Sequence, residues 1–146
     1  MPTAGKLVAA LLFAAVGYGA AIAFIPELPE GTQVKIFPEI NAVIGMLVGW
    51  WVMGSQVGNP LLAAARRGLG TSVYLLFWAD FVFSMRDMVI NSTKFVYPTP
   101  TKAVLGFFDN MVAFFLMSLT PAVLTILVVG GLSAGIAAEL AHRKWR

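Results

Sequence analysis

Residues 75–84 read LLFWADFVFS, in which a single acid, Asp80, stands among eight apolar residues and one serine. In a water-soluble protein, such an acid would mark a helix boundary or a paired group in the core. In a bilayer, an ionisable side chain is by default interpreted as a functional residue, and a group that pairs with it is expected. The choice between these interpretations depends on the solvent around the segment, and the composition of the whole chain decides it.

The composition is that of a membrane protein. Of the 146 residues, 59% are hydrophobic and only 12% are charged, and the mean hydropathy is +0.83. These values lie well outside the usual balance of a globular domain. The chain has no cysteine, which excludes disulfide bonds, thiolate metal sites and thiol redox chemistry.

Four apolar segments have about the 20 residues that a helix needs to cross a hydrocarbon core of roughly 30 Å. They are residues 7–25, 37–54, 69–90 and 121–141. We therefore predict an all-α integral membrane protein with one transmembrane helical domain, residues 1–146. The triplet at 21–23, Ala-Ile-Ala, would also suit a signal-peptide cleavage site, although the first apolar run is longer than usual for one.

Two further helices are expected outside the four spans. Asn59 as N-cap and Pro60 as first helical residue predict a short helix at the membrane surface before the third span. Thr99 can cap another helix over residues 100–119, in which Lys102, Asp109 and Asn110 reduce the apolar character. A Thr-Pro pair at 120–121 separates this segment from the last span. We expect it to be interfacial or half-buried.

The distribution of charge fits four spans with both termini in the cytoplasm. The basic residues on the side of the termini are Lys6, Arg66, Arg67, Arg143, Lys144 and Arg146. The opposite side receives Glu27, Glu30 and Glu39. The basic residues form no stripe that would indicate nucleic-acid binding, and we expect them to contact anionic lipid headgroups.

Asp80 heads a stripe of polar residues at helical spacing. The stripe is Asp80, Ser84, Asp87 and Asn91. It could form a proton or cation path outward from mid-bilayer. The alternative is structural: Asp80 stays neutral and donates a hydrogen bond to another helix. Its possible partners are Asn41, Thr71, Ser133 and Tyr18. No Lys or Arg lies in a central apolar segment, and Arg86 is nearer the outer boundary.

Pairs of glycines one helical turn apart predict close helix packing. Gly45 and Gly49 lie in the second span, and Gly131 and Gly135 in the last. Such faces let backbones approach closely in lipid, either within one bundle or at an oligomer interface. The chain has one histidine and no nucleotide-binding motif, so we predict neither a metal site, nor a cofactor, nor enzymatic activity.

Several stretches together are similar to a known family. They read MPTAGKLVAALLFAA, LPEGTQ, NAVIGMLVGWWVMG, LLFWADFVFS and TPAVLTILVVGGLSAGIAAELAHRKWR. With these stretches, which cover nearly the whole chain, it resembles the TrgA family of bacterial tellurium-resistance membrane proteins. The resemblance implies a multi-pass inner-membrane protein linked to tellurite tolerance, and it carries over no catalytic or binding residues.

Three functions follow as hypotheses. The first is a non-enzymatic protein of the tellurite-resistance system, in which Arg86, Lys94 and Lys102 contact anions on the outer side and other membrane proteins or further copies of the chain are partners. The second is an accessory subunit that packs against a larger membrane complex through its glycine faces. The third is a small proton-coupled transporter that depends on Asp80, although the chain lacks the repeats common in transporters.

Overall fold

The computed structural model describes residues 3–145, and within them helices are the only regular secondary structure. The main helices are α1 (Ala4–Phe24), α2 (Phe37–Val48), α3 (Leu61–Thr93), α4 (Pro100–Ser118) and α5 (Pro121–Lys144). A short 3₁₀ turn, Ile25–Glu27, follows α1. After α2 the chain stays helical through a π-helical turn, Gly49–Met53, and a 3₁₀ turn, Gly54–Gln56. The prediction of an all-α protein is confirmed.

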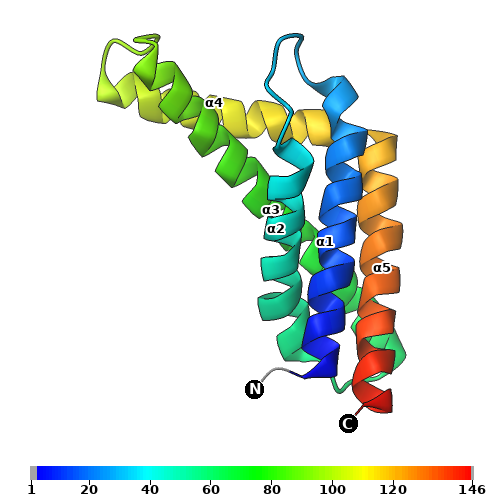
Figure 1. The fold of residues 1–146 in the computed structure, drawn as a ribbon. Helices are drawn as coiled ribbons and strands as arrows, with labels where there is room; N and C mark the ends of the chain where they lie inside the picture. Colours follow the sequence, from blue (N-terminus) through cyan, green and yellow to red (C-terminus); the bar gives the residue numbers. More distant parts are fainter. Residues whose placement is uncertain (1–2, 146) are drawn as a thin grey trace.

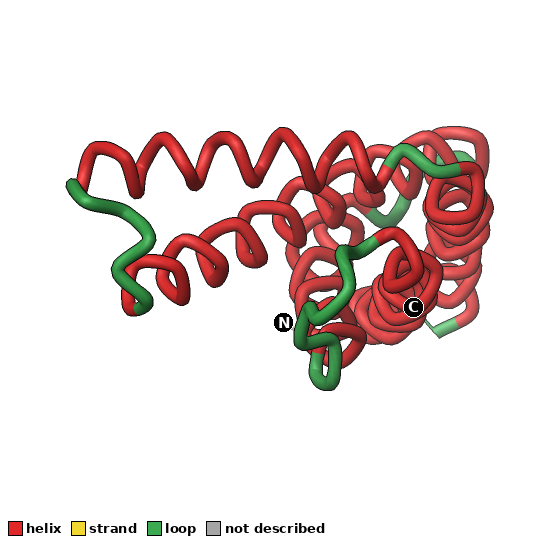
Figure 2. Tube along the Cα trace, turned by 90° about the horizontal axis from the view of Figure 1, so that it is seen from above, coloured by secondary structure: helices red, strands yellow, loops and turns green. Residues whose placement is uncertain are grey.

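The helices α1, α2 and α5 stand side by side as an upright bundle (Figure 1). Helix α3 is steeply tilted and runs from the end that carries both termini to the opposite end. Helix α4 then lies across that opposite end, and the α3–α4 turn projects away from the bundle, as the view from above also shows (Figure 2). The two chain termini therefore lie at one end of the molecule, which we term the termini end.

Within residues 3–145, four helices are long and apolar enough to cross a membrane. They are Ala4–Glu27, Phe37–Gln56, Pro100–Ser118 and Pro121–Lys144. This confirms a helical membrane protein. Three of these candidates match predicted spans, and the remaining one is α4. The predicted third span, residues 69–90, belongs to α3 and is not among the four candidates. Five charged side chains of α3, Arg66, Arg67, Asp80, Arg86 and Asp87, lower its apolar character.

The arrangement of the helices favours α3 over α4 as the crossing element. With 33 residues, α3 is about 50 Å long at 1.5 Å per residue. A helix of that length can cross a core of roughly 30 Å even when it is strongly tilted. Helix α4 has the length but lies crosswise to the bundle (Figure 1), as expected of an interfacial helix.

The prediction of a separate surface helix before the third span is wrong. Residues 61–93 form one continuous helix, whose N-cap is Pro60 rather than Asn59. The Asn59 side chain does not cap it and instead donates a hydrogen bond to the Gln56 carbonyl oxygen at 2.9 Å. Other boundaries agree with the sequence: the Thr99 hydroxyl accepts from the Lys102 amide at 3.4 Å, and α5 begins at Pro121.

The predicted packing glycines lie at contacts between helices of this chain. Gly45 and Gly49 of α2 face α1, and a Cβ atom on Gly49 would lie 2.6 Å from the Ala9 carbonyl oxygen. Gly131 and Gly135 of α5 face Gly68 of α3. All of these glycines are buried, so the backbones meet where a side chain would keep them apart.

The α3–α5 contact runs over three successive turns of each helix. From the termini end, Ala64 and Gly68 meet Gly135 and Gly131. One turn further, the Ser72 hydroxyl donates a hydrogen bond to the Leu127 carbonyl oxygen at 2.8 Å. Sequence reasoning did not identify Gly68, although it is the glycine on which the α3 side of this contact depends.

We expect Gly68→Ala to destabilise the bundle, because its Cβ would meet the Gly131 backbone. Overpacking of this kind costs about 1–3 kcal/mol. Gly70→Ala is the matched control two residues along the same helix, because a Cβ there meets nothing within 4 Å. Thermal unfolding in detergent measures both. A Gly68→Ala protein that melts with the wild type would show that this close contact does not support the fold.

Candidate functional site

A cavity lies at the end of the bundle opposite the termini and is lined by all five helices and the loop after α1. Its lining is mostly apolar, with Asp80, Arg86 and Asp87 of α3 as its charged side chains. About 50 Å³ of it can hold the centres of water molecules. One water needs roughly 10–15 Å³ of such space, so the cavity has room for a cluster of about three to five waters.

Asp80 lines this cavity and is only 7% exposed. Within the described part of the chain, its carboxyl group forms no hydrogen bond or ion pair. The predicted hydrogen bond to another helix is therefore not formed. A carboxyl group that neither the protein nor water satisfies is costly in a membrane protein, and the cavity that Asp80 lines is the space where water or another partner could be placed.

The groups expected to form a hydrogen bond with Asp80 either donate to a backbone carbonyl of their own helix or lie in an exposed side chain. The Asn41 amide donates to the Phe37 carbonyl oxygen at 3.0 Å, the Thr71 hydroxyl to Arg67 at 2.8 Å, and the Ser133 hydroxyl to Gly130 at 3.1 Å. The fourth candidate, Tyr18, is 42% exposed. Short polar side chains in helices commonly bond to the preceding turn in this way. Because these side chains donate to backbone carbonyls of their own helices, none of them forms a hydrogen bond with Asp80.

The predicted polar stripe is only partly assembled at the cavity. Asp80 and Asp87 line it, whereas Ser84 and Asn91 do not. Ser84 is completely buried, and its hydroxyl has no hydrogen-bond partner within residues 3–145. Asn91 is half-buried near the end of α3. The stripe is thus no continuous row of groups along one open path.

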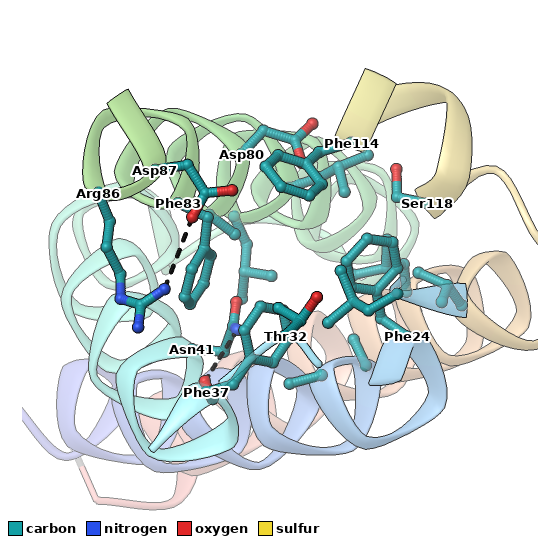
Figure 3. A pocket seen from close by; sticks show the side chains of 18 of the residues that line it. Phe24, Thr32, Phe37, Asn41, Asp80, Phe83, Arg86, Asp87, Phe114 and Ser118 are labelled. Atoms are coloured by element: carbon teal, nitrogen blue, oxygen red, sulfur yellow. Dashed lines mark hydrogen bonds and ion pairs between the residues drawn. The ribbon is translucent and has the colours of Figure 1, made fainter. Parts of the chain in front are cut away.

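The three outer-side basic residues are likewise not gathered into one site. Arg86 lines the cavity, and its Nη1 lies 3.6 Å from Oδ1 of Asp87. Lys94 and Lys102 are exposed near the α3–α4 turn and are not part of the lining. In the close-up, Asp80 and Asp87 extend from the same helix, α3, and the dashed line joins Arg86 to Asp87 (Figure 3).

Aromatic rings form much of the cavity wall. Phe24, Phe37 and Phe83 make a series of contacts, with ring centroids 5.8 Å apart for the first pair and 4.2 Å apart for the second. Phe114 of α4 adds a fourth ring. Figure 3 shows the four labelled rings around the cavity, with Asp80 beside Phe114. A cation is attracted to the face of an aromatic ring, and the carboxyl groups of Asp80 and Asp87 border the same space.

A second buried acid, Glu139, lies near the termini end and was missed from the sequence. It is 1% exposed. Its Oε2 accepts hydrogen bonds from the backbone amides of Gly58 at 2.7 Å and Asn59 at 3.2 Å. Its Oε1 accepts from Nε of Arg143 at 3.0 Å. The spacing of Glu139 and Arg143, four residues apart on one helix, was the available signal.

This network joins α5 to the loop before α3. Arg143 also donates from Nη2 to the Asn59 carbonyl oxygen at 2.9 Å, and Arg67 donates from Nη1 to the Gln56 carbonyl oxygen at 2.7 Å. Two of the termini-side arginines, Arg67 and Arg143, are therefore engaged by the protein itself. Of the predicted basic tail, Lys144 is the last residue of α5, and Arg146 lies outside the described residues.

The comparisons with known proteins give no relative to set beside this geometry: no family model, curated protein or solved structure matches the chain. Among residues 3–145, no group of three or more His, Cys, Asp or Glu side chains could hold a metal ion. The chemistry of the site therefore depends on Asp80, its neighbours and the shape of the cavity.

We expect Glu139→Gln to lower the free energy of unfolding by about 1–3 kcal/mol, because the amide group keeps only one accepting oxygen for three donors. Glu30→Gln changes an exposed loop acid and serves as the control. Unfolding midpoints in the same detergent compare the two variants. Equal midpoints for both would mean that the Glu139 network does not hold α5 to the loop.

Proposed function

We propose that the chain is a small, non-enzymatic, multi-pass protein of the bacterial inner membrane that contributes to tellurite tolerance and acts through Asp80. One observation carries the choice of Asp80: this acid is buried beside a cavity, and no group of the described chain pairs with it. The cost of such a group in a membrane makes a functional role the better explanation. The similarity to the TrgA family supports the link with tellurite.

The proposed topology has α1, α2, α3 and α5 crossing the membrane, with both termini in the cytoplasm. Basic residues concentrate at the termini end, in the first turn of α1, the second turn of α3 and the last turn of α5. Such a distribution is typical of cytoplasmic loops and tails. Helix α4 then lies at the outer interface, and the cavity is close to the outer end of the bundle.

The chemistry of the chain limits how it could assist tellurite tolerance. Without cysteine, it cannot reduce tellurite through a thiol. The cavity is a poor site for an oxyanion, because Asp80 and Asp87 both border it and the guanidinium of Arg86 is paired with Asp87. We therefore place the contribution in the cavity's binding of another molecule or in membrane integrity, and not in binding tellurite there.

An accessory role in a larger complex is a second candidate, but it needs a different surface. The packing glycines are buried in contacts within the chain and are not free for another protein. Helix α4 offers an apolar surface instead. Its exposed apolar residues are Val104, Leu105, Phe108, Val112, Phe115 and Leu116. Specific co-purification of a large partner that is lost on polar substitution of α4 would favour this candidate.

Deletion of the gene should increase sensitivity to tellurite, and the wild-type gene on a plasmid should restore growth. We expect Asp80→Asn, which keeps the size and removes the charge, to fail to restore it. Asp109→Asn alters an exposed acid of α4 outside the cavity and should complement fully. Membrane levels of each protein are compared by immunoblot.

Two results would contradict the proposal in different ways. Unchanged sensitivity in the deletion strain would remove the link with tellurite. Full complementation by Asp80→Asn at equal protein level would leave that link and remove Asp80 from the mechanism.

A further inference from the structure

We propose that the cavity beside Asp80 binds a methylated ammonium group, either of a free small cation or of a lipid headgroup. This inference rests on the proposed function in one respect, namely that Asp80 is the functional residue. It does not require that the protein contributes to tellurite tolerance. It follows from three features of the cavity: its charge, its aromatic wall and its size.

The charge of the cavity favours a cation. Two carboxyl groups, those of Asp80 and Asp87, and one guanidinium, that of Arg86, border the space. The guanidinium lies 3.6 Å from the Asp87 carboxyl group, so these two groups offset one another. Asp80 is left as the group without a counter-charge, and a cation in the cavity would supply one.

The type of cation follows from the remaining lining. A metal ion such as Mg²⁺ or Ca²⁺ needs several oxygen ligands, and within residues 3–145 no cluster of three suitable side chains exists. Ammonium groups that carry methyl groups are instead recognised by aromatic rings together with a nearby acid. Phe24, Phe37, Phe83 and Phe114 provide the rings (Figure 3).

The size of the cavity selects a compact group. Space for about three to five waters suits a trimethylated or tetramethylated ammonium group, and the open side of the cavity leaves room for the rest of a larger molecule. The polar loop residues Thr32 and Gln33 also line the cavity, and they belong to the connection between α1 and α2 at the end opposite the termini. A headgroup of the adjacent leaflet or a dissolved cation could therefore reach Asp80 from that end.

Binding is tested with the purified full chain in maltoside detergent, using tetramethylammonium chloride as the probe and titration calorimetry as the measurement. We expect saturable binding by the wild type that weakens at least about tenfold in Asp80→Asn, since loss of one charge contact of about 1.4 kcal/mol is a factor of ten. Asp109→Asn should bind like the wild type. Sodium chloride at equal concentration controls for ionic strength.

A variant in the aromatic wall separates recognition from simple charge attraction. Phe114→Leu keeps an apolar side chain on α4 and removes a ring, and we expect it to weaken tetramethylammonium binding while near-ultraviolet circular dichroism and the unfolding midpoint report an intact fold. Absence of saturable binding by the folded wild type, or equal binding by wild type and Asp80→Asn, would overturn the proposal.

The source of the ammonium group is read from competition. Displacement of tetramethylammonium by choline as effectively as by dodecylphosphocholine supports a free cation, and much stronger displacement by dodecylphosphocholine supports a lipid headgroup. These binding data are independent of the tellurite phenotype: binding without a phenotype would count against the proposed function alone, and a phenotype without binding would count against this inference alone.

Discussion

The close approach of α5 to α3 at Gly68, Gly131 and Gly135 is the contact on which the rest of the structure depends. In a bilayer, helices gain little from burying apolar side chains against one another, so backbone proximity and dispersion contacts must hold them together. Here the glycines allow that proximity over three turns, and Ser72 adds a hydrogen bond to the Leu127 carbonyl oxygen. Beyond this contact α3 leans away from the upright helices (Figure 1).

The tilt of α3 gives the two ends of the molecule different characters. At the termini end, Glu139 has a full set of donors from the loop before α3 and from Arg143, so a buried acid there is fully satisfied. At the opposite end, the helices are spread enough to leave a cavity, and the buried acid Asp80 has no such donors. The buried acid at the termini end, Glu139, therefore joins α5 to the loop before α3. The buried acid at the opposite end, Asp80, has no protein partner among residues 3–145 and can bind another molecule.

Much of the fold follows from the sequence because it depends on local features. Apolar length predicts the helices, Thr99 and Pro121 set boundaries that the structure keeps, and the glycine pairs at 45/49 and 131/135 lie at packed faces. The failures depend on distant contacts. Gly68, within the continuous α3, packs against Gly131 and Gly135 of α5, and the two amides that bind Glu139 come from 81 and 80 residues earlier.

The sequence predicts which residue is central to the site, but it does not predict the surroundings of that residue. An acid within LLFWADFVFS singles out Asp80 from the sequence alone. Its lack of a partner could not be foreseen, because Asn41, Thr71 and Ser133 each donate to a carbonyl of their own helix. The cavity itself is formed by residues from five helices, and the spacing of residues within one helix carries no information about it.

The central claim is that α3 crosses the membrane and α4 lies across its surface, although α4 is the more apolar of the two. Either choice gives four crossings and the same side for both termini, so only the α3–α4 turn distinguishes them. The chain has no cysteine, and single exposed residues can be changed to cysteine and labelled with an impermeant maleimide in oriented vesicles. Ser55→Cys marks the termini end, and Glu30→Cys marks the other. The account predicts that Ser92→Cys is labelled from the same side as Glu30→Cys; labelling from the side of Ser55→Cys would contradict it.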